Sequence, residues 1–427
     1  MLDDRYIRIL TRWLVVILFL KIAGYFTLSE NVAVTRVLKI ILRTGMTVAI
    51  ILVYRDLRSR GAFAIREFGN LIVPVLYGAY LFLGFLSLFW SSDPGYSALQ
   101  LGMIVESFVF AYYFVLVYRL VLHYRPDASL RVSHLLSRST GVILLVFLLG
   151  IIFLPEKFYR LTHGGEEARL GGYLMNPNEL GMLSVVGAGM CCLELLKGAK
   201  KGWPIFFLLV TITALVLTGS RSSLIGFTLV LLYFVNKSSN RKVKLATVVT
   251  MIAAFPLALS TIIFKGGDVE EVMNMTGRIP FWTALLTEGL PKEPLLGFGF
   301  MRIAYEDYFQ SVHTYAGQMT HNTFIQVVMN LGLVGLALVL IQVAVTIVAF
   351  VRNKDEDFRR FFVALFIPII INSFTEFGIF GETNYGILFY QLLLFFLAVR
   401  VSTRPTFKEQ VLSRAMQRPR PRYHSVS

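Results

Sequence analysis

Twelve apolar runs, separated by short polar or basic segments, constrain this chain more than any other feature of its sequence. Apolar runs with few charges are typical of helices that cross a bilayer, which takes about 20 residues per crossing. Of the 427 residues, 56% are hydrophobic and 16% are charged, which argues against an ordinary soluble domain. The sequence therefore predicts an all-α polytopic membrane protein with about 12 transmembrane helices.

The first run is followed by no small-residue cleavage site, so we expect a retained span and not a signal peptide. The expected spans are Thr11–Leu28, Val37–Tyr54, Leu71–Trp90, Ala98–Val121, Thr140–Leu154, Glu179–Leu196, Trp203–Thr218, Ser222–Val235, Leu245–Phe264, Leu331–Phe350, Phe361–Thr375 and Asn384–Val399. The seventh and eighth are short, so this pair either crosses fully or forms a re-entrant hairpin.

Lysine and arginine counts orient the spans. With the N-terminus inside, the inner segments hold 29 of the 41 basic residues, which is the cytoplasmic bias of inner-membrane proteins. We therefore expect both termini to be cytoplasmic and a large periplasmic loop, 265–320, between spans 9 and 10. The predicted domains are a transmembrane domain over 1–402 and a basic cytoplasmic tail over 403–427.

Several function classes are disfavoured. The net charge of +15 could suggest nucleic acid, but the basic residues are scattered between apolar runs, where topology explains them. Cys191 and Cys192 are adjacent in an apolar run and offer neither a disulfide framework nor zinc-ligand spacing. The outer segments have no Asp-x-Asp pair to hold a divalent ion and no glycine-rich phosphate loop. We expect no metal, no cofactor and no nucleic-acid partner.

Two arginines are placed on the outer side. Arg221 follows Ser220, a plausible N-cap, and a cation in the first turn opposes the helix dipole, so it is a poor choice for helix stability alone. Arg278 precedes a predicted helix, Ile279–Gly289, whose apolar face could press on the membrane. The alternatives are a boundary arginine that reaches lipid headgroups and a solvated loop arginine.

His321 and Asn322 lie at the outer start of the tenth span, with Gly332 and Gly335 below them. An imidazole that faces water at a helix N-terminus is suited to act as a general base, and the glycines would allow close helix packing. The plainer alternative is a histidine that only reaches the interface.

Other polar residues at outer turns are candidates for sugar binding. Asn176, Asn178 and Glu179 open the sixth span, and Asp93 lies in a similar turn, although both segments could simply be capped helix starts. Glu106 lies within the fourth span, where an acid is a functional candidate by default.

A basic stripe recurs at helical spacing on the outer half of the second span: Arg36, Lys39 and Arg43. Cations in hydrocarbon are costly, and either a lipid phosphate or nearby acids could neutralise these.

Four motifs, in this order, resemble the O-antigen ligase and polymerase superfamily of bacterial membrane glycosyltransferases. They are Asn176-Pro177-Asn178-x-Leu180-Gly181, Gly219-Ser220-Arg221, Gly277-Arg278-x-x-x-Trp282, and His321-Asn322-x9-Gly332-x-x-Gly335. The resemblance implies about a dozen spans and a large outer loop. It also implies transfer of a glycan from undecaprenyl diphosphate on the periplasmic side, with Arg221 and Arg278 on the diphosphate and His321 assisting the acceptor hydroxyl.

The resemblance and the outer site together predict a metal-independent, inverting glycosyltransferase of the inner membrane. We expect an O-antigen ligase of lipopolysaccharide biosynthesis that acts on lipid A–core, because the basic stripe would suit a phosphorylated acceptor. The alternatives are an O-antigen or exopolysaccharide polymerase that uses a second lipid-linked repeat and, less favoured by the outer cluster and the lack of a repeat, a transporter of an anionic lipid.

Overall fold

The computed structural model describes residues 3–60, 65–126, 130–162, 167–198, 201–258, 278–300, 320–376 and 378–402. Most of the predicted outer loop 265–320 and the whole predicted tail 403–427 lie outside these residues.

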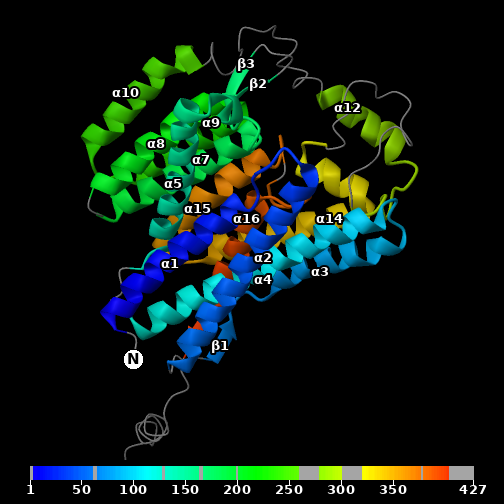
Figure 1. Cartoon of the computed structure of the whole chain (residues 1–427), viewed down its shortest axis with the longest axis horizontal. Coiled ribbons are helices and arrows are strands. Elements are labelled where there is room, and N and C mark those ends of the chain that lie inside the picture. Colours follow the sequence, from blue (N-terminus) through cyan, green and yellow to red (C-terminus); the bar gives the residue numbers. More distant parts are fainter. Residues whose placement is uncertain are drawn as a thin grey trace, which may run out of the picture.

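The described chain is a bundle of helices with two short strand pairs (Figure 1). The helices are α1 (Asp4–Ala23), α2 (Val32–Ser59), α3 (Ile72–Leu86), α4 (Pro94–Tyr124), α5 (Val132–Phe153), α6 (Pro155–Phe158), α7 (Pro177–Leu196), α8 (Gly202–Thr218), α9 (Arg221–Lys237), α10 (Arg241–Ala258), α12 (Arg278–Ala284), α14 (Thr323–Arg352), α15 (Glu356–Asn372) and α16 (Tyr385–Ala398). Antiparallel pairs join β1 (Ile65–Phe68) to β4 (Val399–Ser402) and β2 (Tyr159–Thr162) to β3 (Glu167–Leu170).

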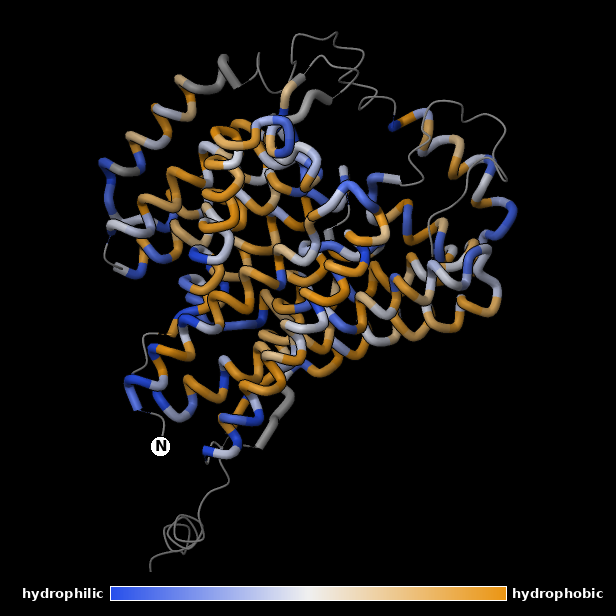
Figure 2. Tube along the Cα trace, in the orientation of Figure 1, coloured by the Kyte–Doolittle hydropathy of each residue, from blue (hydrophilic) through white to orange (hydrophobic). Residues whose placement is uncertain are grey.

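The predicted helical architecture is confirmed: each of the twelve predicted spans overlaps a helix. Within the described residues, six helical segments are long and apolar enough to cross a membrane, namely Val32–Ser59, Ile72–Phe89, Pro94–Tyr124, Val132–Phe153, Pro177–Leu196 and Thr323–Arg352. Apolar residues run along the middle of the bundle, and hydrophilic ones gather at helix ends (Figure 2). The count of twelve crossings stays a prediction.

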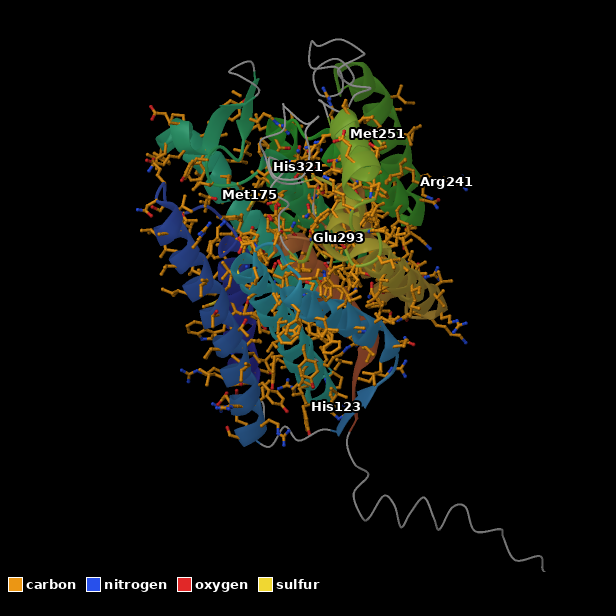
Figure 3. All side chains as sticks on the ribbon, turned by 90° about the vertical axis from the view of Figure 1, so that its right-hand side faces the viewer. His123, Met175, Arg241, Met251, Glu293 and His321 are labelled. Carbon is orange, nitrogen blue, oxygen red and sulfur yellow. The ribbon has the colours of Figure 1, made fainter. Side chains whose placement is uncertain are left out.

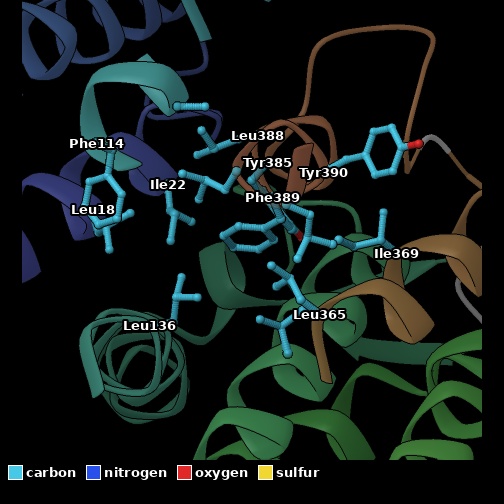
Figure 4. Packing of buried hydrophobic residues seen from close by; sticks show 14 of the residues in the cluster. Leu18, Ile22, Phe114, Leu136, Leu365, Ile369, Tyr385, Leu388, Phe389 and Tyr390 are labelled. Carbon is cyan, nitrogen blue, oxygen red and sulfur yellow. The ribbon is translucent and has the colours of Figure 1, made fainter. Parts of the chain in front are cut away.

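Helix α16 forms the centre of the bundle. Every residue from Tyr385 to Ala398 is buried, as expected for a helix that is apolar on all sides. Its side chains meet those of α1, α4, α5 and α15; Tyr385 and Phe389, for example, lie among Ile22, Leu136 and Leu365 (Figure 4). This packing fixes where α16 begins, and with it the loop that precedes it.

That loop, between α15 and α16, follows the eleventh predicted span, and much of it is buried. Glu376, Ile379, Phe380 and Glu382 are each at most 9% exposed. The Phe380 ring packs against Tyr77, with ring centroids 5.1 Å apart. A buried loop must satisfy its polar groups inside the protein, so this one connects neighbouring helices through hydrogen bonds.

Helix α14 is interrupted at Gly332, which has φ 63° and ψ −162°. The prediction that Gly332 and Gly335 serve close helix packing is therefore corrected at Gly332, where the glycine breaks the helix. Segment 294–299 fills the break. Its backbone bonds to both sides of it: Phe298 and Gly299 amides donate to Met329 and Asn330 carbonyls, while Pro294 and Leu295 carbonyls accept from Leu333 and Val334 amides.

We predict that Gly332→Ala destabilises the protein. A Cβ there would overlap the Leu295 carbonyl, and alanine disfavours this backbone conformation. The matched control is Gly102→Ala in α4, where a Cβ would meet nothing within 4 Å and alanine improves helix propensity. Thermal unfolding of the purified variants should show a lower midpoint for Gly332→Ala only. Equal midpoints would contradict this role of the break.

Candidate functional site

One buried carboxylate, Glu376, gathers three of its neighbours from distant parts of the chain. His321 Nδ1 lies 2.6 Å from Glu376 Oε2. Arg278 Nη2 and Asn178 Nδ2 lie 3.1 Å and 2.9 Å from Oε1. The Glu376 side chain is 3% exposed, whereas those of Arg278 and His321 are 16% and 22% exposed. The carboxylate is thus the inner anchor of a site whose histidine and arginine still reach solvent.

The backbone sets the direction of the imidazole. His321 has φ 50°, the only positive φ of a non-glycine residue in the described chain. This left-handed conformation is disfavoured for a side chain of this size and persists only where surrounding contacts hold it. Here the next residue, Asn322, caps α14 by accepting bonds from the amides of Phe324 and Ile325.

Arg278 begins α12, which continues as one π-turn through Leu285–Gly289, so the helix predicted over Ile279–Gly289 is confirmed. Its buried face packs inside the protein: Phe281 and Leu285 contact Phe298 and Met329 of the segment that fills the break in α14 and of α14 itself. Ile279 and Leu286 stay exposed, and contact of this helix with the membrane stays a prediction.

Hydrogen bonds to two backbone carbonyls hold α12 at the site. Trp282 Nε1 donates to the Thr320 carbonyl at 2.6 Å, one residue before His321. Arg278 Nη1 donates to the Thr375 carbonyl at 2.6 Å, one residue before Glu376. The tryptophan and arginine of the third motif therefore bind the chain beside the histidine and the glutamate.

The second arginine motif approaches the same network from α9. Ser220 caps α9, and the Ser223 hydroxyl donates to the Asn178 carbonyl at 3.3 Å. Gly181 allows this approach, since a Cβ there would lie 2.5 Å from Ser223 Oγ. Arg221 is the first residue of α9 and is half-buried, so the network reaches the turn that carries it.

Arg169, on β3, was not predicted as a site residue. Its Nε donates to the Thr218 carbonyl at 2.7 Å and its Nη2 to Asn178 Oδ1 at 2.9 Å. Because Asn178 in turn donates to Glu376, a continuous chain of hydrogen bonds links the end of α8 to the imidazole. Arg169 is 7% exposed and acts as a positioning residue.

The charge state of Glu376 follows from its partners. Burial alone would raise the pKa of this carboxyl, but the positive charge of His321 in its protonated form, that of Arg278, and the hydrogen bonds of His321 and Asn178 outweigh burial and lower it to about 2. An ionised carboxylate only accepts hydrogen bonds, so in the neutral imidazole Nδ1 of His321 carries the proton, and Nε2 is the nitrogen left to face a substrate.

The remaining polar candidates of the outer turns have different surroundings. Asn176 caps α7. Glu179 lies beside the network: it interacts electrostatically with Glu376, and Asn384 Nδ2 is 3.5 Å from its Oε1. Asp93 is exposed and caps α4 by accepting from the Tyr96 amide, which is the plainer alternative weighed for it.

The basic stripe on α2 divides into two parts. Arg36 is exposed, and Lys39 is half-buried and interacts electrostatically with Glu179. Arg43, by contrast, is 2% exposed and pairs with Glu106 at 3.4 Å, and Lys21 pairs with the same glutamate. Of the two partners that the sequence allowed for Arg43, a lipid phosphate or a nearby acid, the structure shows the acid. Glu106 pairs with both buried cations, Arg43 and Lys21.

The comparisons with known proteins bear on residues at the centre of this geometry. Residues 206–340 match a protein-family model described as O-Antigen ligase. This match supports the resemblance to the O-antigen ligase and polymerase superfamily that the four motifs carry. The matched stretch contains Ser220, Arg221, Arg278 and His321, whereas Glu376 lies after it. A search of curated proteins found no match to the chain.

Sequence reasoning missed Glu376 and Arg169. Glu376 has a signal, because it is an acid at the outer end of an apolar span, where a carboxylate could meet the outer cations. For Arg169, the only signal in the sequence is its position in a predicted outer segment. Among the described residues, no three His, Cys, Asp or Glu side chains gather as a metal site.

We predict that Glu376 contributes stability that acid removes. A carboxyl whose folded pKa is depressed, here to about 2 from an ordinary value near 4.5, stabilises the fold above the unfolded pKa and loses that contribution as pH falls towards 2. The gap in unfolding midpoint between wild type and Glu376→Gln should therefore shrink as pH falls from about 5 to 2. Glu293→Gln, which removes an exposed acid, is the control. A gap that stays constant with pH would contradict the ion pairing.

Proposed function

We propose that this protein is a glycosyltransferase of the bacterial inner membrane that moves a glycan from undecaprenyl diphosphate to an acceptor hydroxyl on the periplasmic side. The observation that carries the proposal is that one ionised carboxylate, Glu376, holds both His321, just before α14, and Arg278, the first residue of α12. A base and a cation at fixed positions are the two groups that glycosyl transfer from a diphosphate requires.

The imidazole takes the proton. With Nδ1–H bound to Glu376, Nε2 of His321 accepts the proton of the acceptor hydroxyl as its oxygen attacks the anomeric carbon. A carboxylate behind a catalytic histidine fixes its tautomer and stabilises the imidazolium that forms. General-base assistance of this kind contributes roughly 10²–10⁴-fold to a rate.

The arginines receive the leaving group. As the new carbon–oxygen bond forms, the bond from the anomeric carbon to the diphosphate oxygen breaks and negative charge grows on that oxygen. Arg278, already oriented by Glu376 and the Thr375 carbonyl, and Arg221, at the start of α9, would stabilise this charge without a metal ion. In-line displacement inverts the anomeric centre.

The acceptor we favour is lipid A–core, which makes the protein an O-antigen ligase. Arg36, exposed on the outer half of α2, would meet phosphate groups of such an acceptor, whereas Lys39 interacts with Glu179 and Arg43 is used inside the bundle. The alternative is a polymerase that joins two lipid-linked repeats. Deleting the gene distinguishes them: loss of a ligase leaves lipid-linked polymer unattached, and loss of a polymerase leaves single repeats attached.

We predict that His321→Ala abolishes transfer while leaving binding of the lipid-linked donor largely intact. The imidazole is assigned to the acceptor proton and the arginines to the diphosphate. Transfer in purified membranes and donor binding should be measured on the same preparation, with His321→Asn as a second variant because asparagine tolerates the left-handed backbone. Wild-type rates in either variant would remove the base role.

We predict that Arg221 and Arg278 bind one diphosphate. Lysine at either position should impair donor binding, because it lacks the planar fork of arginine. Losses from Arg221→Ala and Arg278→Ala should be non-additive, since each removes part of one shared site. A double-mutant cycle on donor affinity measures this, and strictly additive losses would refute a shared site.

A further inference from the structure

The opposite end of the bundle carries a cavity that the transfer reaction does not use. Helix α14 begins beside His321 and, after its break at Gly332, ends at Arg352. The cavity has a volume of about 780 Å³ and is lined by Arg352, by residues of α4 such as His123, and by the start of β4. His123 and His321 lie towards different ends of the molecule (Figure 3).

The lining of this cavity is strongly cationic. Arg119, Arg352, Lys354 and Arg400 contribute four positive charges, and Asp355 contributes the one acid among the lining residues. Asp355 is already engaged, because its carboxylate caps α15 by accepting from two backbone amides. The other lining residues include apolar side chains from the last turns of α4 and α16.

Helix dipoles account for only part of this charge. The C-termini of α4, α14 and α16 meet here, and each carries about half a negative charge. Three such ends and one acid balance about 2.5 of the four cations, so a positive excess of about one to two charges remains. The cytoplasmic bias of basic residues explains cations at this end, but it does not require them to surround a cavity.

Arg119 contributes a fixed guanidinium to this lining. Its Nη2 donates to the Phe396 carbonyl at 3.1 Å, near the end of α16. The guanidinium also lies over the Phe396 ring, 5.7 Å from the ring centroid.

We propose that this cavity binds a phosphate group, and that the phosphate is the headgroup of an anionic phospholipid from the cytoplasmic leaflet. Arginine and lysine are the usual partners of phosphate oxygens, and an apolar floor beneath cations matches a headgroup joined to its glycerol and acyl chains. The cavity size is that of a small-molecule site. This proposal does not depend on the glycosyltransferase reaction.

The test compares two double variants of the full-length protein. Arg352→Gln/Arg400→Gln removes two cations of the cavity while leaving the Arg119 cap on α16 in place. Arg359→Gln/Arg360→Gln removes two arginines a few residues away, in α15, that do not line the cavity. The variants are matched in residue type and number, so general surface charge affects both alike.

Binding is measured in detergent by native mass spectrometry with phosphatidylglycerol, with phosphatidylcholine, and separately with inorganic pyrophosphate. We expect phosphatidylglycerol to be retained over phosphatidylcholine, an affinity loss of about tenfold or more in the cavity variant, and a loss under about twofold in the control. Binding of pyrophosphate alone, with the same dependence on the cavity arginines, would support a phosphate site with a soluble ligand. Equal losses in both variants, or no binding that depends on the cavity, would overturn the proposal.

Discussion

The candidate site depends on a single buried carboxylate. Glu376 accepts hydrogen bonds from a histidine just before α14, an arginine of α12 and an asparagine of α7. These bonds, together with the positive charge of Arg278, favour its ionised form. A buried charge is tolerated only when it is paired and hydrogen-bonded, so removing any partner leaves the others poorly satisfied. The interactions of these residues are therefore coupled through Glu376, and a change at one of them affects the others.

This carboxylate needs a rigid support, which the bundle provides in two ways. The loop that carries Glu376 is buried and precedes α16, the helix whose every residue is inside the protein. The histidine sits before α14, whose break at Gly332 is filled by segment 294–299. The strained φ of His321 is stable because both supports hold it, and a fixed imidazole direction is what proton transfer requires.

Much of the architecture could be predicted from sequence, because apolar runs and caps are local signals. The runs located helices, and Ser220, Asn322 and Asn176 do cap the helices that follow them. Arg278 and His321 were singled out by residue type and predicted topology, and the structure brings them together at one carboxylate.

What sequence could not give depends on contacts between distant segments. Glu376 lies 55 positions after His321, and nothing local marks it as the partner. The sequence predicted that Gly332 is a packing residue. Its non-helical backbone angles depend on contacts with a segment more than 30 residues away, which no local signal reveals. Similarly, Arg43 looked available to a lipid phosphate until Glu106 was found beside it, 63 positions along the chain.

The central claim is that Glu376 acts on catalysis through His321. A double-mutant cycle on the rate of glycan transfer, with Glu376→Gln, His321→Gln and the double variant in reconstituted membranes, tests it most directly. If the carboxylate acts by orienting the imidazole, the double variant should be about as slow as His321→Gln alone. Rate losses that multiply in the double variant would show that the two residues act independently and would contradict the account.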